Sequence, residues 1–206
     1  MSRSRTPSDL FGLCPACFLR SAACVCKALP TAQTALRIVV LRHASERWST
    51  TNTARLVGLV LPAAEIWDYG QQGAPPLDAR ALEPLSRGRL LYPAEGALPP
   101  PPGPRAPILV VPDGRWQHTR RLVRRHAVLE GMARLSLGAR PRPLLNLRGE
   151  HAVERRSTLE AISDALALLG EAAASRALRE AHACFLEARA RSAQGERDQH
   201  GDHGQP

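Results

Sequence analysis

Lysine is nearly absent from this sequence of 206 residues, because Lys27 is the single lysine among 28 Lys and Arg side chains. Arginine therefore carries almost all of the positive charge, and its planar guanidinium suits phosphate groups and stacks on nucleobases. A coding sequence rich in G and C accounts equally well for the Arg/Lys ratio. It does not account for the net charge of +9, which favours a polyanionic partner.

Long apolar runs are also absent. No run approaches the roughly 18 residues that a membrane helix needs. The segment from Met1 to Asp9 is polar and lacks the apolar core of a signal peptide. We therefore expect a cytoplasmic protein with no membrane partner. The hydrophobic content of 44% is sufficient for the core of one domain with short extensions.

Cysteine is scarce, and four of the five cysteines fall between positions 14 and 26, as Cys14-x-x-Cys17 and Cys24-x-Cys26. Four thiolates at such short spacing predict a tetrahedral zinc knuckle, and a zinc with four protein ligands is structural. Four unrelated buried cysteines, or a redox-active Cys-x-x-Cys pair, remain alternatives. Cys184 lies among Ala and Leu residues and is expected to pack in the core.

Strand and helix patterns alternate along the chain, which predicts an α/β domain with a mostly parallel sheet. The predicted strands are 35–41, 65–69, 89–92, 108–111 and 144–147. The predicted helices are 50–61, 116–131, 158–169 and 172–191, with a turn at 71–74 and an extended proline-rich loop at 99–104. This pattern divides the chain into a flexible arm (1–10), the knuckle (11–30), one domain (31–191) and a disordered tail (192–206).

The start of the third predicted helix has a specific signature. Ser157 and Glu160 match a capping box, in which each side chain accepts a hydrogen bond from the backbone of the other residue. Apolar residues at positions 159, 162, 166 and 169 then share one face of the helix. Gly170 is a plausible stop for this helix.

The segment Asp113-Gly-Arg-Trp116 follows the clearest strand and precedes a helix. The carboxyl end of a strand in an open α/β sheet is where ligands bind. Gly114 permits a close approach of a ligand, Asp113 offers an acceptor and Trp116 can stack. In the alternative interpretation, Asp113 caps the helix and Trp116 packs in the core.

The helix after Trp116 is strongly basic. It carries Arg120, Arg121, Arg124 and Arg125, with His118 and His126 beside them. Acidic partners at helical spacing are missing, which favours a basic patch beside the proposed site over an ordinary solvated face.

Several short blocks occur in a fixed order over residues 14–190. They are the cysteine knuckle, His43-Ala-Ser-Glu46, Thr51-Asn-Thr-Ala-Arg-Leu56, Ser86-Arg-Gly88 with Leu91-Tyr-Pro-Ala-Glu-Gly96, Asp113-Gly-Arg-Trp116, and Leu147-Arg148 with Ser157-Thr-Leu-Glu-Ala161. In this order they resemble the DTW-domain family of tRNA-uridine aminocarboxypropyltransferases. Arg115 stands where the family has its eponymous threonine.

The resemblance implies a SPOUT-like α/β domain with a C-terminal knot. It also implies transfer of the 3-amino-3-carboxypropyl group of S-adenosylmethionine to N3 of a tRNA uridine, with methylthioadenosine released. We expect a monomer with structural Zn²⁺ whose partner is tRNA and not DNA. A zinc-knuckle RNA-binding protein without catalysis and a SPOUT-like RNA methyltransferase remain alternatives.

On this interpretation Asp113 and Trp116 are catalytic, with Asp113 accepting or orienting the imide proton of uridine. The residues expected to bind the co-substrate are Leu91, Tyr92, Pro93, Gly96, Gly114, Arg148, Ser157, Thr158 and Glu160. Those expected to bind RNA are Asn52, Arg55, Arg120, Arg121, Arg124 and Arg125. The expected metal ligands are Cys14, Cys17, Cys24 and Cys26. His43 is expected to be a hydrogen-bonded residue at a strand end.

Overall fold

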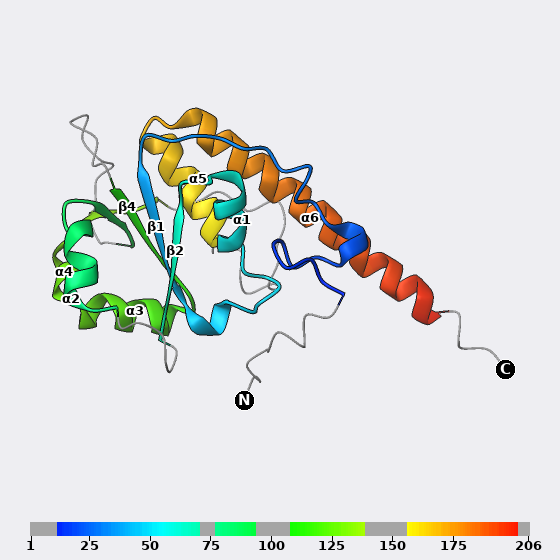
Figure 1. Cartoon of the computed structure of the whole chain (residues 1–206), viewed down its shortest axis with the longest axis horizontal. Coiled ribbons are helices and arrows are strands. Elements are labelled where there is room, and N and C mark those ends of the chain that lie inside the picture. Colours follow the sequence, from blue (N-terminus) through cyan, green and yellow to red (C-terminus); the bar gives the residue numbers. More distant parts are fainter. Residues whose placement is uncertain (1–11, 71–76, 94–107, 139–155, 202–206) are drawn as a thin grey trace.

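The computed structural model describes residues 12–70, 77–93, 108–138 and 156–201. Its centre is a five-stranded sheet in the order β2-β1-β4-β3-β5, and every neighbouring pair of strands is parallel (Figure 1). The strands are β1 Arg37–His43, β2 Glu65–Tyr69, β3 Arg89–Leu91, β4 Ile108–Asp113 and β5 Ala133–Leu135. The predicted α/β fold with a parallel sheet is confirmed.

Helices cover both faces of this sheet (Figure 1). One face packs against α1 (Ala54–Val60), α5 (Thr158–Leu168) and α6 (Ala172–Gly201). The other face packs against α2 (Ala79–Leu82), α3 (Trp116–Arg125) and α4 (Ala127–Gly131). Because both faces are covered, the central strands are apolar at successive positions rather than at alternate ones. Thus Ile38 and Val40 face one cluster, while Val39 and Leu41 face the other.

The predicted helix over 116–131 is interrupted in the structure. Its two parts meet at His126, whose backbone is extended with φ −118° and ψ 104°. A straight helix over 116–131 would be about 24 Å long, whereas the six residues of β4 span about 20 Å. The break lets the chain turn back into β5. Both β5 and α2 were missed by the sequence analysis, because segments of three and four residues carry no readable periodicity.

The ends of two other helices also differ from the prediction. Helix α1 begins at Ala54 and not at position 50, and α6 continues to Gly201. The predicted end at 191 is therefore too early, and residues 202–206 of the predicted tail lie outside the described residues. Residues 192–201 include Ala, Gln, Glu and Arg and contain no proline, so the helix can continue through them.

The predicted capping box of α5 is confirmed. Ser157 Oγ accepts a hydrogen bond from the Glu160 amide at 3.3 Å, and Glu160 Oε2 accepts one from the Ser157 amide at 2.9 Å. The buried side chains of Leu159 and Ile162 fix this helix against the sheet. Gly170, with φ 81°, follows the helix. The start of α5 is therefore held at a defined place above the sheet edge.

Several predicted features lie outside the described residues. They are the flexible arm at 1–10, the turn at 71–74, the proline-rich loop at 99–104, the strand at 144–147 and the C-terminal knot, which depends on the segment 139–155. Within the described part of the chain, none of the helices has the length and apolar character needed to cross a membrane.

Candidate active site

Three parallel strands end together at one edge of the sheet. His43 of β1 is in register with Tyr69 of β2, and Asp113 of β4 is in register with Arg42 of β1. Helix α5 begins at the same edge, because Thr158 donates a hydrogen bond to Asp113 Oδ1. This is the position at which ligands bind in open α/β sheets.

Asp113 is buried, with 4% of its surface exposed. Its Oδ2 accepts a hydrogen bond from Asn52 Nδ2 at 2.7 Å, while its Oδ1 accepts the one from Thr158. The carboxylate therefore links β4, the loop before α1 and the start of α5. It does not cap α3, because the N-cap of that helix is Arg115. The interpretation of Asp113 as a helix cap is wrong.

Trp116 is not a core residue either, because 49% of its surface is exposed. Its ring stacks on that of Tyr92, with the centroids 5.3 Å apart and the planes 14° from parallel. This pair borders an open pocket of about 500 Å³ at the ends of β3 and β5. The pocket is lined by Tyr92, Pro93, Trp116, Arg120, Val123, Arg124, Glu130, Arg134 and Ser136.

Asn52 and Arg55, which were predicted to bind RNA, are both buried, with only 3% and 7% of their surfaces exposed. Arg55 donates hydrogen bonds to the carbonyl oxygens of Asn52 and Arg47 at 3.1 Å and of Ser49 at 2.8 Å. Burial, followed by the charge of Arg42, lowers the pKa of Arg55 to about 10. Arg55 thus shapes the loop 47–52, and that loop holds Asn52 against Asp113.

His43 lies in the middle of this edge. Its ring stacks on that of His118 with the centroids 3.7 Å apart, and its Nδ1 lies 2.7 Å from Ser45 Oγ. Burial, followed by the charges of His118 and Arg115, lowers the pKa of His43. The expectation of a hydrogen-bonded residue at a strand end is therefore confirmed. The stacked partner was not predicted.

Gly114 is required by this packing. Its φ is 149°, and a Cβ atom there would lie 3.0 Å from the Cβ of His43. A side chain at this position would therefore need both an unfavourable backbone conformation and a displaced imidazole. The sequence analysis expected a ligand to approach Gly114 closely. Among the described residues, it is the side chain of His43 that makes such an approach.

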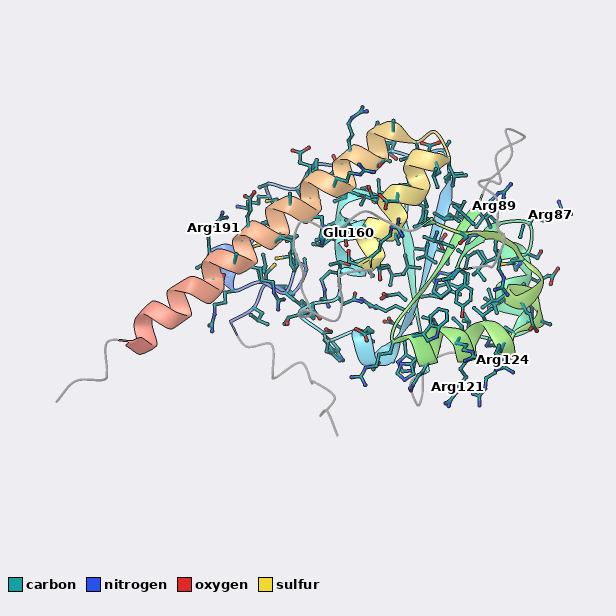
Figure 2. The ribbon with its side chains drawn as sticks, turned by 180° about the vertical axis from the view of Figure 1, so that it is seen from behind. Arg87, Arg89, Arg121, Arg124, Glu160 and Arg191 are labelled. Atoms are coloured by element: carbon teal, nitrogen blue, oxygen red, sulfur yellow. The ribbon has the colours of Figure 1, made fainter. Side chains whose placement is uncertain are left out.

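The other residues predicted to bind the co-substrate differ in their burial and in their hydrogen-bond partners. The side chain of Leu91 is buried in the core cluster, so a contact of Leu91 with the co-substrate would have to be made by its backbone. Ser157 and Glu160 are joined in the capping box, and Thr158 is hydrogen bonded to Asp113. Figure 2 shows Glu160 in α5. Gly96 and Arg148 lie outside the described residues.

The four N-terminal cysteines form a compact cluster, with all Sγ atoms within 4.8 Å of one another. The Sγ atoms of Cys14 and Cys26 are 3.7 Å apart, and those of Cys17 and Cys24 are 3.9 Å apart. A tetrahedral zinc with bonds of about 2.3 Å places its sulfurs about 3.8 Å apart. The cluster therefore has the shape of a metal site.

Charge also favours a cation at this cluster. Burial, followed by the neighbouring sulfurs, raises the pKa of Cys26, and a bound cation would favour its thiolate form. Cys184 does not belong to the cluster and packs against the hydrophobic core, as predicted.

The knuckle is part of the main core. Cys17, Leu19, Val25 and Leu29 belong to the same buried cluster as α1, α5 and α6. The guanidinium of Arg55 lies 3.4 Å from the ring centroid of Phe18. The other aromatic neighbour of Phe18 is Trp48, whose ring is parallel to it with the two centroids 6.2 Å apart. The cysteine cluster is thus joined, through Phe18, to the loop that holds Asn52.

The predicted basic surface is present on α3. All four of its arginines are exposed, and Figure 2 shows Arg121 and Arg124 pointing away from the sheet. In the described part of the chain, none of the four forms an ion pair. They divide into two pairs, because Arg120 and Arg124 line the pocket whereas Arg121 and Arg125 do not.

The family model of the DTW domain matches residues 12–190, which is most of the chain. This chain belongs to the DTW-domain family. No solved structure matches it. The match includes the four cysteines, the Asp113–Trp116 turn and the start of α5, and membership is consistent with a tRNA-modifying role. In this DTW-domain protein Arg115 replaces the eponymous threonine at an exposed position, so the longer side chain needs no room in the core.

Proposed function

We propose that this DTW-domain protein transfers the 3-amino-3-carboxypropyl group of S-adenosylmethionine to N3 of a tRNA uridine. In this reaction a bond forms between N3 and the γ-carbon of the transferred group. The bond between that carbon and the sulfonium breaks, and its electron pair goes to sulfur, which leaves in methylthioadenosine. The imide proton of N3 must go to a base.

The observation that carries the proposal is the buried carboxylate of Asp113 at the edge where three strands and α5 meet. Its oxygens accept hydrogen bonds from Asn52 and from Thr158. A carboxylate oxygen can accept more than one hydrogen bond, so these contacts are compatible with a role for Asp113 in accepting the imide proton. Its two partners hold it in one orientation, which is what proton transfer at a fixed site needs.

Helix α5 supplies the other groups that this reaction uses. The positive end of its helix dipole lies at the same edge and attracts a carboxylate such as that of the co-substrate, although the amides of Ser157, Leu159 and Glu160 already donate hydrogen bonds within the protein. Glu160 remains the proposed partner of the ammonium group, with one of its oxygens already used by the capping box. Gly114, Gly96 and Arg148 complete the proposed co-substrate site.

We also propose that the cysteine cluster binds one structural Zn²⁺, and that the protein acts as a cytoplasmic monomer on tRNA. The distances between the four sulfurs support the choice of zinc. The packing of the knuckle in the core disfavours the alternative of an independent RNA-binding knuckle, because its apolar residues are shared with α1, α5 and α6.

The reaction is tested by incubating the purified protein with S-adenosylmethionine and unmodified tRNA transcripts. We expect aminocarboxypropyl-uridine in the digested tRNA and an equal amount of methylthioadenosine, both measured by mass spectrometry. S-adenosylhomocysteine with a methylated nucleotide would instead identify an RNA methyltransferase. Binding of tRNA without either product would favour a non-catalytic RNA-binding protein.

A further inference from the structure

Phe18 adopts a backbone conformation that is unfavourable for a residue with a side chain. It follows Cys17 in the knuckle, and its φ of 60° is the one positive φ of a non-glycine residue in the described part of the chain. The left-handed region is costly for residues that carry a Cβ atom, whereas glycine adopts it readily. Glycine would therefore suit this backbone, and a favourable contact of the Phe18 ring has to offset the strain.

The ring of Phe18 makes its contacts inside the protein. Only 6% of its surface is exposed, and the guanidinium of Arg55 lies over the ring at 3.4 Å from the centroid. The parallel ring of Trp48 belongs to the loop 47–52, while Arg55 belongs to α1. Phe18 thus connects the knuckle with two segments that surround Asn52.

Arg55 is a buried cation that depends on this ring. Within the described part of the chain it forms no ion pair, and its N–H groups donate to the carbonyl oxygens of Arg47, Ser49 and Asn52. A desolvated charge without a carboxylate partner is costly. The electron-rich face of an aromatic ring compensates part of that cost, which an aliphatic side chain cannot do.

We propose that Phe18 is a positioning residue for the reaction, and this proposal rests on the proposed function. Its ring holds the guanidinium of Arg55, and Arg55 fixes three carbonyl groups of the loop 47–52. The loop then presents Asn52, whose Nδ2 donates to Asp113 at 2.7 Å. Phe18 itself touches neither substrate, and it gives the knuckle a part in orienting the carboxylate.

The first test measures hydrogen exchange in the loop 47–52 of the purified full-length protein by mass spectrometry. The amides of Arg47, Ser49 and Asn52 are hydrogen bonded to carbonyl oxygens within residues 44–49, so they exchange slowly while the loop is ordered. Phe18→Leu keeps an apolar side chain but removes the aromatic face. We expect these amides to exchange at least about 10-fold faster in this variant, with an unchanged metal content.

Val25→Ala is the matched control, because Val25 is buried in the same knuckle and the change leaves the Phe18 ring in place. It should lower the melting temperature but keep slow exchange in the loop 47–52 well below that temperature. Phe18→Tyr retains the ring and should also exchange slowly. Unchanged exchange in Phe18→Leu, or an equal acceleration in Val25→Ala, would overturn the proposal.

The route through Arg55 is tested by a double variant. Arg55→Lys keeps the positive charge but loses the planar fork of donors that reaches three carbonyl groups. If Phe18 acts through Arg55, adding Phe18→Leu to Arg55→Lys should accelerate loop exchange no further. Additive effects of the two changes would show that Phe18 acts by another route and would overturn the proposal.

Product formation provides the second readout. Phe18→Leu is expected to lower kcat about 10-fold and to leave the KM for S-adenosylmethionine within about twofold, because it alters the orientation of Asp113 and not the binding of the co-substrate. Val25→Ala should keep its kcat. A normal kcat for Phe18→Leu despite faster loop exchange would overturn the positioning role. Absence of product with the unchanged protein would instead refute the proposed function, while the exchange comparison separately decides whether Phe18 orders the loop.

Discussion

Replacement of Asp113 by asparagine is expected to lower the formation of aminocarboxypropyl-uridine by at least about 100-fold, the usual contribution of a general base. Thermal stability and tRNA affinity should stay close to those of the unchanged protein. The measurement is product formation at saturating S-adenosylmethionine, followed by mass spectrometry of digested tRNA.

The surroundings of Asp113 allow the asparagine side chain to keep hydrogen bonds with Thr158 and Asn52. An amide at position 113 can still accept the hydrogen bond from Thr158. Its new NH₂ group would face the Nδ2 of Asn52, but the buried Oδ1 of Asn52 has no hydrogen-bond partner among the described residues. A rotation of the Asn52 amide by half a turn therefore restores this contact while the negative charge is removed.

Thr158 supplies matched controls for the same test. Thr158→Val removes the hydroxyl that orients Asp113, so we expect a smaller loss of turnover, about 10-fold, from a positioning residue. Thr158→Ser keeps a hydroxyl and should retain most of the activity. Near-normal turnover of Asp113→Asn would show that the carboxylate is structural, while the transferase proposal would still rest on its product assay.

Loss of metal is expected to have the largest effect on stability. Purified protein should contain one zinc per chain by elemental analysis, and Cys17→Ser should lower the melting temperature by about 10 °C or more. Cys17 is fully buried, and its neighbours Leu19 and Val25 belong to the main core. A knuckle that opens without metal would therefore expose part of that core.

Cys184→Ser is the control for this prediction, because Cys184 packs on the core but is not among the clustered cysteines. It should keep the zinc and most of the stability. Trp48 provides a second readout, since its stack on Phe18 makes its fluorescence sensitive to the knuckle. A folded protein that contains no metal and melts at an unchanged temperature after treatment with a chelator would contradict the prediction.

Local signals in the sequence predicted local structure well. The capping box at Ser157, the strand at 65–69 and the spacing of the four cysteines each involve residues close together in the chain, and each is present in the structure. The sequence also predicted that Asp113 lies at the ligand-binding edge of the sheet. A strand pattern shows where a strand ends, and ligands bind at the carboxyl ends of parallel strands.

The errors concern contacts between distant segments. The pattern around Asn52 and Arg55 gives no sign that both residues are buried, or that Phe18 of the knuckle covers the guanidinium of Arg55. The stack of Tyr92 on Trp116 joins the ends of two strands and was equally invisible in the sequence. Such contacts follow from packing, which periodicity and propensity do not specify.

The order of synthesis has a consequence for when this site can form. Asn52 lies in the first third of the chain, whereas Thr158 and Arg189, which donates a hydrogen bond to the carbonyl of Thr50, lie in the last quarter. Proteins emerge from the ribosome with the N-terminus first. A nascent chain that ends before α5 has the strands and the cysteines but lacks the hydroxyl that orients Asp113 and the helices that cover one face of the sheet. We therefore expect the proposed activity to begin only after the last helix has left the ribosome, and a chain from a truncated message to be inactive.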